Sequence, residues 1–219
     1  MRPCFAAALF AAVAPAIAWG QAQELAAGRF LVSSRSLGDP NFAETVILLV
    51  RYSEDDGTVG LIVNRQTDIP LSRVFRDIKG AKDRKDPVYM GGPVEPGSVL
   101  ALLKSASKPE EATHLFADVY LISSRALLEK SLSGGAEANA FRVYLGYAGW
   151  GAGQLEHEMQ VGAWHVLPAD AATVFDPDPD AVWARMIRKM ELRIAWDGYR
   201  PNSPHLLVCG DPGDALADH

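Results

Sequence analysis

A succession of short apolar runs, separated by turn residues, constrains the fold of this chain more than any other feature of its sequence. The runs follow one another too closely for a bundle of long helices. Residues 45–52, TVILLVRY, are so continuously apolar and β-branched that both faces of this segment should be covered, which predicts a central strand. The polar turn 53–57 ends in Gly57 and leads into a partner strand at 58–64, so we expect a hairpin.

The same pattern predicts further strands at residues 29–33, 88–90, 98–103, 116–123, 141–147 and 164–167. Fewer helices are expected, at residues 124–131, 154–161 and 179–192. The last of them has apolar residues at 3.6-residue spacing, with Asp178 as its expected cap and Pro179 in its first position. The chain is therefore predicted to be rich in strands, with helices between and after them.

The first 18 residues have the three parts of a signal peptide. Arg2 carries a positive charge, residues 5–18 form an uncharged apolar run, and Ala16-Ile17-Ala18 matches a cleavage site between small residues. The run is too short for a membrane span, which needs about 20 apolar residues. We therefore expect export to the periplasm or outside the cell, with cleavage after Ala18. The alternative is a mis-assigned start codon, with a cytoplasmic protein that begins near Leu25.

Composition narrows the classes of protein to which this chain can belong. With 219 residues, 48% of them hydrophobic and 22% charged, the chain fits one ordinary globular domain and neither a disordered nor a disulfide-rich protein. We divide it into the signal peptide, a lead at 19–27, the domain at 28–195 and a Pro/Gly-rich tail at 196–219. The 27 acidic residues outnumber the 21 basic ones, which opposes nucleic-acid binding. Cleavage leaves Cys209 as the only cysteine, so we expect a buried structural thiol and no internal disulfide.

Three patterns resemble chemical motifs but fail on inspection. Ser105 and Lys108 have the Ser-x-x-Lys spacing, yet Pro109 keeps the lysine out of a helical conformation, so a loop is favoured. The segment 176–180, DPDPD, begins like a calcium loop but lacks the required Gly and Glu, and its acids are better explained by helix capping. The five histidines lack zinc-finger or H-E-x-x-H spacing. No metal and no cofactor is predicted.

The glycine-rich segment 146–154 runs from a predicted strand into a predicted helix, where backbone N–H groups can hold an anion. It departs from G-x-G-x-x-G, and Glu156 and Glu158 already place negative charge near that helix end. A tight structural turn is therefore favoured over a phosphate loop.

Taken in order and spacing, these segments resemble the YqgE/AlgH family of bacterial proteins over residues 28–194. The matching stretches are Asp39–Phe42, Gly60–Arg65, Gly91–Val94, Gly146–Trp150 and Gly153–Glu158, with Trp164 and the helix that contains Trp183. The resemblance implies a compact mixed α+β domain with a branched or barrel-like β-sheet flanked by helices. It implies no established biochemical activity. Family members are usually cytoplasmic and begin close to the first strand, so the N-terminal segment and the tail are departures.

A candidate ligand-binding site follows from the expected strand ends and helix face. We predict that a polar, glycine-lined cleft is formed by Asn64, Gly91, Gly92, Trp150, Gln154 and Glu158, with the last two on one helical face. The alternative is that Asn64 and Gln154 bind loop backbone, that Glu158 faces solvent, and that the glycines serve only tight turns.

Three functions stay open. The first is a non-catalytic module that binds an unknown small ligand or an envelope protein. The second is a hydrolase with Glu158 or His157 as its base, for which the sequence offers no paired nucleophile. The third is the transcriptional regulator that some family members are labelled, although we find neither a helix-turn-helix pattern nor a basic face. We predict negligible specific DNA binding, no catalytic residue and no stable membrane anchor, and leave the oligomeric state open.

Overall fold

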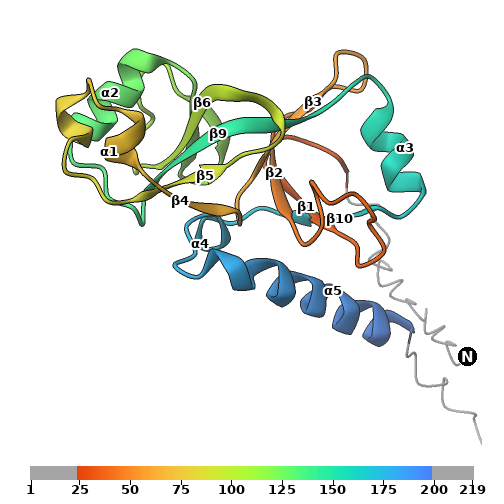
Figure 1. The fold of residues 1–219 in the computed structure, drawn as a ribbon. Coiled ribbons are helices and arrows are strands. Elements are labelled where there is room, and N and C mark those ends of the chain that lie inside the picture. Colours follow the sequence, from red (N-terminus) through yellow and green to blue (C-terminus); the bar gives the residue numbers. More distant parts are fainter. Residues whose placement is uncertain (1–23, 199–219) are drawn as a thin grey trace, which may run out of the picture.

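Ten strands form one branched sheet in the computed structural model, which describes residues 24–198 (Figure 1). The strands are β1 Arg29–Ser33, β2 Val46–Arg51, β3 Thr58–Ile62, β4 Gln66–Pro70, β5 Pro87–Met90, β6 Val94–Lys104, β7 Thr113–Phe116, β8 Val119–Ile122, β9 Phe141–Trp150 and β10 Trp164–Pro168. Eight of them follow the order β10-β1-β2-β3-β9-β6-β8-β7, and the β4–β5 pair branches off at β9.

Helices flank the sheet at its ends and along one side (Figure 1). They are α1 Leu71–Val74, α2 Arg125–Ser133, α3 Gln154–Gln160, α4 Ala171–Val174 and α5 Val182–Gly198, with 3-10 turns η1 Lys79–Ala81 and η2 Pro179–Ala181. Figure 1 shows α1 and α2 at one end of the sheet, α3 at the other end, and α5 beneath β1 and β2. The predicted α+β class with a branched, barrel-like sheet flanked by helices is confirmed.

The branch lies at β9, which has different partners along its length. One edge of β9 pairs with β6, while the other pairs with β5 through residues 144–145 and with β3 through residues 148–150. At the fork, Gly91 donates its N–H to Leu145 O and accepts a hydrogen bond from the N–H of Ile62. A Cβ atom at Gly91 would lie 2.3 Å from the carbonyl oxygen of Gly146, which itself has a φ of +66°. Only glycine permits this close approach of backbones.

Strand β2 lies between β1 and β3 and is buried on both faces, as its apolar run predicts. Val46 and Leu48 belong to one core cluster, which includes Trp183 of α5. Ile47 and Leu49 belong to a second cluster on the opposite face. The β2–β3 hairpin is also confirmed, with Gly57 at a φ of +85°.

Several local predictions are wrong. The single strand expected at 116–123 is interrupted, because Ala117 adopts a φ of +42° and separates β7, which ends at Phe116, from β8. Strand β4 and the short helices α1 and α4 were not predicted, since none of these segments of four or five residues has a clear apolar periodicity. Strand β6 begins at Val94 rather than at residue 98, with a register shift against β9.

The last helix also differs from its expectation. Asp178 makes no side-chain capping hydrogen bond; Pro179 opens the 3-10 turn η2, and α5 begins only at Val182. The Asp176 carboxylate instead accepts from the N–H of Asp178, and both aspartates form ion pairs with Arg185. Helix α5 continues to Gly198, across the boundary predicted at 195.

Two predicted segments lie mainly or wholly outside the described residues. The signal peptide at 1–18 is outside, as are Cys209 and the tail from residue 199 onward. Within residues 24–198, no helix combines the length and apolar character needed to cross a bilayer.

Candidate functional site

Helix α3 begins at Gln154, after a short turn that follows the end of β9 at Trp150, and brings three of the predicted site residues together. The carboxylate of Glu158 accepts hydrogen bonds from the indole N–H of Trp150 at 2.9 Å and from that of Trp164 at 2.8 Å, both on Oε2. Its other oxygen accepts from the Gln154 amide at 2.9 Å. We name Glu158, Trp150, Trp164 and Gln154 the Glu158 cluster.

The Glu158 cluster is packed as well as hydrogen-bonded. Trp150 and Trp164 are 5% and 3% exposed and meet edge to face, with ring centroids 6.0 Å apart. Phe42 stacks on Trp150 at 6.2 Å, and Gln154 Oε1 accepts from the N–H of Gly151 at 3.1 Å. Because both oxygens of Glu158 already accept hydrogen bonds, this carboxylate is engaged in joining β9, α3 and β10.

The remaining predicted residues lie around the start of β2 and the sheet branch. Asn64 is 8% exposed; its Oδ1 accepts from the N–H of Val46 at 2.8 Å, and its Nδ2 donates to the carbonyl of Glu44 at 2.9 Å. Glu44 has a φ of +56°, so the Asn64 amide holds a turn in the left-handed region. Gly91 and Gly92 are buried at the fork, where a Cβ at Gly92 would lie 2.1 Å from the carbonyl carbon of Tyr147.

The structure thus brings Trp150, Gln154 and Glu158 together and places Gly91 and Gly92 at the fork. No hydrogen bond among the described residues joins the Asn64 side chain to the Glu158 cluster. Asn64 and Gln154 bind loop backbone, as the structural alternative anticipated, but Glu158 does not simply face solvent as that alternative expected, because it binds two buried indoles. That the six residues bind a ligand stays a prediction.

A different concave site lies between the β4–β5 hairpin, the start of β9 and the loop after α4. This cavity has a volume of about 310 Å³. It is lined by Gln66, Asp86, Pro87, Tyr89, Ala138, Asn139, Phe141, Arg142, Phe175 and Pro177. We call it the Arg142 cavity. None of the six predicted site residues lines it.

Arg142 gives this cavity its charge. The residue is 6% exposed, and its guanidinium donates from Nη1 to the carbonyl of Val174 at 2.8 Å and from Nη2 to the carbonyl of Asp176. The guanidinium carbon lies 4.5 Å from the ring centroid of Tyr89 and 6.0 Å from that of Phe175. Within residues 24–198, Arg142 has no ion pair with a carboxylate.

The groups around Arg142 modify the cavity without neutralising that charge. Burial raises the pKa of Tyr89, the positive charge of Arg142 partly opposes this rise, and the Tyr89 hydroxyl bonds Gln66 Oε1 at 3.3 Å. The one carboxylate that lines the cavity, Asp86, forms an ion pair with Arg84. The Asp86–Arg84 pair is neutral as a unit, so the wall keeps one positive charge.

A second, smaller cavity of about 130 Å³ lies beside α2. It contains apolar side chains and Arg125, whose guanidinium is paired with Asp77 and Glu129. Over the part of the chain that the structure describes, no three His, Cys, Asp or Glu residues are grouped to hold a metal ion.

The sequence reasoning did not single out Arg142, although β9 contains a signal for it. Along this strand, buried positions alternate between two faces, with Phe141 and Val143 on one and Arg142 and Tyr144 on the other. An arginine inside such an apolar alternation must find polar partners on other elements. Those partners, Val174 and Asp176, come more than 30 positions later in the chain.

Comparisons with known proteins place this fold in a family. The family model described as AlgH-like matches residues 30–195. The chain belongs to this family. AlgH-like relatives include a UPF0301 protein of Streptomyces coelicolor, 33% identical over 182 residues, which are 82% of this chain and 94% of the relative. Another, from Azoarcus sp., is 34% identical over 170 residues, which are 76% and 89% of the two chains.

Two solved structures share the AlgH-like fold. One is the solution structure of AlgH from Pseudomonas aeruginosa, with a TM-score of 0.62, 28% identity and coverage of 80% of this chain and 94% of that one. The other is the crystal structure of a Corynebacterium diphtheriae protein, with a TM-score of 0.65, 26% identity and coverage of 76% and 87%. The resemblance found in the sequence motifs is confirmed.

Proposed function

We propose that this AlgH-like chain is a non-catalytic binding module that holds a small ligand in the Arg142 cavity. One observation carries the proposal: a buried arginine forms part of the wall of an open cavity of about 310 Å³. Ligand pockets in proteins start at about 300 Å³ and combine apolar walls with a few placed polar groups. The aromatic rings of Tyr89 and Phe175, together with Arg142, supply that combination.

A binding role is favoured over the hydrolase that the sequence left open. A general base needs a lone pair that can reach the proton of a substrate or water. Glu158 already accepts three hydrogen bonds from side chains of its own cluster, which occupy most of the acceptor positions of a carboxylate, and among the described residues no serine or threonine is hydrogen-bonded to it. His157 is exposed on α3 and does not line the Arg142 cavity.

A binding role is also favoured over the DNA-binding regulator. The net charge of −6 repels phosphate before any base contact can contribute. We propose further that the protein is exported and acts on a small ligand or an envelope protein, because residues 1–18 have the order of a signal peptide. N-terminal sequencing of the protein from its own cells should start at Trp19; a cytosolic protein that keeps residues 1–18 would refute export.

The binding proposal is tested by occluding the cavity. Ala138 is exposed on the cavity wall, so Ala138→Trp should fill the entrance without touching the hydrogen bonds of Arg142. The matched control is Ala152→Trp, at an exposed turn outside the cavity lining. Small molecules retained by the natively purified protein are identified by mass spectrometry. We expect a compound retained by the wild type and the control and lost from Ala138→Trp; equal retention by all three proteins refutes binding in this cavity.

A further inference from the structure

We infer that the Arg142 cavity takes a small organic monocarboxylate, with the carboxylate against the Arg142 guanidinium and an apolar body against Tyr89 and Phe175. This inference rests on the proposed binding function and gives it a ligand class. It follows from three properties of the site: a buried cation without a counter-ion, a single positive charge with acids nearby, and apolar walls.

The first property is the missing counter-ion. A buried charge is expensive to desolvate and is normally paired. Arg142 is buried, yet its partners among the described residues are two backbone carbonyls and two aromatic rings, which stabilise a cation without neutralising it. Those two hydrogen bonds use two of the five N–H donors of a guanidinium. A carboxylate would supply both the missing negative charge and further acceptors in a planar geometry that matches the donors.

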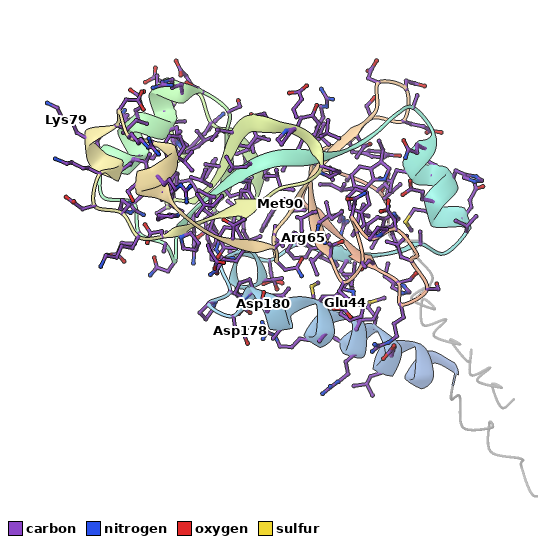
Figure 2. The ribbon with its side chains drawn as sticks, viewed as in Figure 1. Glu44, Arg65, Lys79, Met90, Asp178 and Asp180 are labelled. Atoms are coloured by element: carbon purple, nitrogen blue, oxygen red, sulfur yellow. The ribbon has the colours of Figure 1, made fainter. Side chains whose placement is uncertain are left out.

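The second property is the charge balance. Arg142 contributes one positive charge, while Asp86 on the wall is paired with Arg84. Further acids lie nearby: Asp176, whose carbonyl binds Arg142, and Asp178 and Asp180, which Figure 2 labels where the chain enters α5. A phosphate with nearly two negative charges would leave an excess negative charge close to these acids. A single carboxylate balances the charge of Arg142 and brings less negative charge near these acids than a phosphate does.

The third property is the character of the remaining wall. Beside Arg142 and Asp86 it consists of three aromatic side chains, two prolines, an alanine and two amides: Tyr89, Phe141, Phe175, Pro87, Pro177, Ala138, Gln66 and Asn139. Aromatic and proline surfaces favour an apolar ligand body. The two amides can orient a polar substituent on that body. The ligand class is therefore an organic acid rather than an inorganic anion.

Matched probes separate charge from shape. The full chain, labelled with ¹⁵N, is titrated with benzoate and with isobutyrate, and in parallel with their neutral amides, benzamide and isobutyramide. Inorganic phosphate is the third arm. The readout is the Nε–H signal of Arg142 together with the backbone amides of residues 138–142 and 174–177. We expect both carboxylates to shift these signals saturably, with affinities at least tenfold above those of the amides and of phosphate.

Two variants locate the effect. Arg142→Gln removes the cation and should weaken benzoate binding at least tenfold, because a charge-assisted contact is lost. Arg125→Gln is the matched control: Arg125 is paired with two acids, Asp77 and Glu129, and none of the three lines the Arg142 cavity, so benzoate affinity should stay within twofold. If Arg142→Gln fails to fold, Ala138→Trp takes its place, since it blocks the cavity while Arg142 keeps its contacts.

Each outcome decides a different claim. Equal binding of acids and amides in the cavity overturns the monocarboxylate inference but leaves the binding function standing. Phosphate binding as tight as benzoate overturns the preference for a single charge. Carboxylate shifts that persist unchanged in Ala138→Trp mean surface association only and refute the inference. If none of the five probes binds but a native compound is lost from Ala138→Trp, the monocarboxylate class is refuted and binding in the Arg142 cavity stands. If the native compound is not lost either, the monocarboxylate inference and the proposed binding function are both refuted.

Discussion

Replacement of Glu158 by alanine tests whether the Glu158 cluster is structural. The change leaves the indole N–H groups of Trp150 and Trp164 without their acceptor, and these side chains are 5% and 3% exposed. An unsatisfied buried donor costs about 1–3 kcal/mol. Because Glu158 itself is only partly buried, water can reach part of the gap, and we expect a total loss of about 2–5 kcal/mol. For a domain of this size that corresponds to a fall in Tm of about 5–15 °C.

Thermal and urea unfolding, followed by tryptophan fluorescence and by far-UV circular dichroism, measure this loss. The matched control is Glu129→Ala, which removes a helical glutamate whose only described partner is the exposed Arg125 at i−4. Such an exposed pair is worth about 0.3–0.5 kcal/mol, so the control should unfold close to the wild type. Gln154→Ala should fall between the two, because Gln154 is exposed and donates a single hydrogen bond to Glu158.

The opposite result is equally informative. If Glu158→Ala unfolds within about 0.5 kcal/mol of the wild type, a range typical of unremarkable surface changes, the carboxylate does not hold the two tryptophans in place. If that variant also loses a ligand retained by the wild type, Glu158 belongs to a binding site, as the sequence predicted, and the structural interpretation is refuted.

Three further variants test other parts of the fold. Tyr144→Phe should raise the free energy of unfolding by about 1 kcal/mol at pH 7, because the buried Tyr144 hydroxyl makes no hydrogen bond of ordinary geometry in the described structure and has only the nearby charge of Arg142 to stabilise it. Burial also holds the pKa of Tyr144 above its usual range. Above about pH 10 the unfolded wild type therefore loses a proton that the native state keeps, which lowers the wild-type free energy of unfolding. The difference in free energy of unfolding between the variant and the wild type, measured with urea, should widen as pH rises. Gly92→Ala should lower the free energy of unfolding by more than about 3 kcal/mol or prevent folding, since its Cβ would lie 2.1 Å from the β9 backbone. Gly97→Ala is the control and should be nearly neutral, because a Cβ there would meet open space. Soluble yield and Tm measure both effects. Asn64→Ala should lower the free energy of unfolding by about 1–3 kcal/mol in urea titrations, because the buried N–H of Val46 loses its acceptor; an unchanged midpoint would contradict this role.

The strands that the sequence predicted are those whose burial leaves a local pattern. Residues 46–51 are apolar at nearly every position because both faces of β2 are covered, and this requires no knowledge of the rest of the fold. Strand β4, QTDIP, has no such pattern, because it is an edge strand held against β5 by few pairs. Its place comes from a tertiary contact, which a local pattern does not contain.

The start of α5 shows the same limit. Asp178 followed by Pro179 is a valid helix-start signal, and a helical turn does begin there. The Asp178 carboxylate nevertheless forms an ion pair with Arg185, seven positions later, and does not cap the helix as expected. A local capping rule competes here with an ion pair to a residue seven positions away, and only the folded arrangement decides between them.

The candidate site was predicted in part for a similar reason. The i, i+4 spacing places Gln154 and Glu158 on one face of α3, and their side chains do meet at 2.9 Å. That Trp150 and Trp164 bind the same carboxylate oxygen depends on how β9 and β10 are brought together. The spacing thus predicted the contact between Gln154 and Glu158 but not that Glu158 also binds the two tryptophans.

The branch at β9 divides the molecule into an end that contains the Glu158 cluster and an end that contains the Arg142 cavity. Beyond Gly146 the strand pairs with β3, and the last residue of β9 enters the Glu158 cluster, where the polar groups of the cluster bond one another. Before Gly146 the strand pairs with β5 instead, and Arg142 is left facing a cavity with donors to spare. Satisfied polar groups favour stability, whereas an uncompensated buried charge is retained at a cost. The proposed ligand would neutralise Arg142 and remove that cost, so under the binding proposal the β5 side of the branch is the ligand-binding end of this fold.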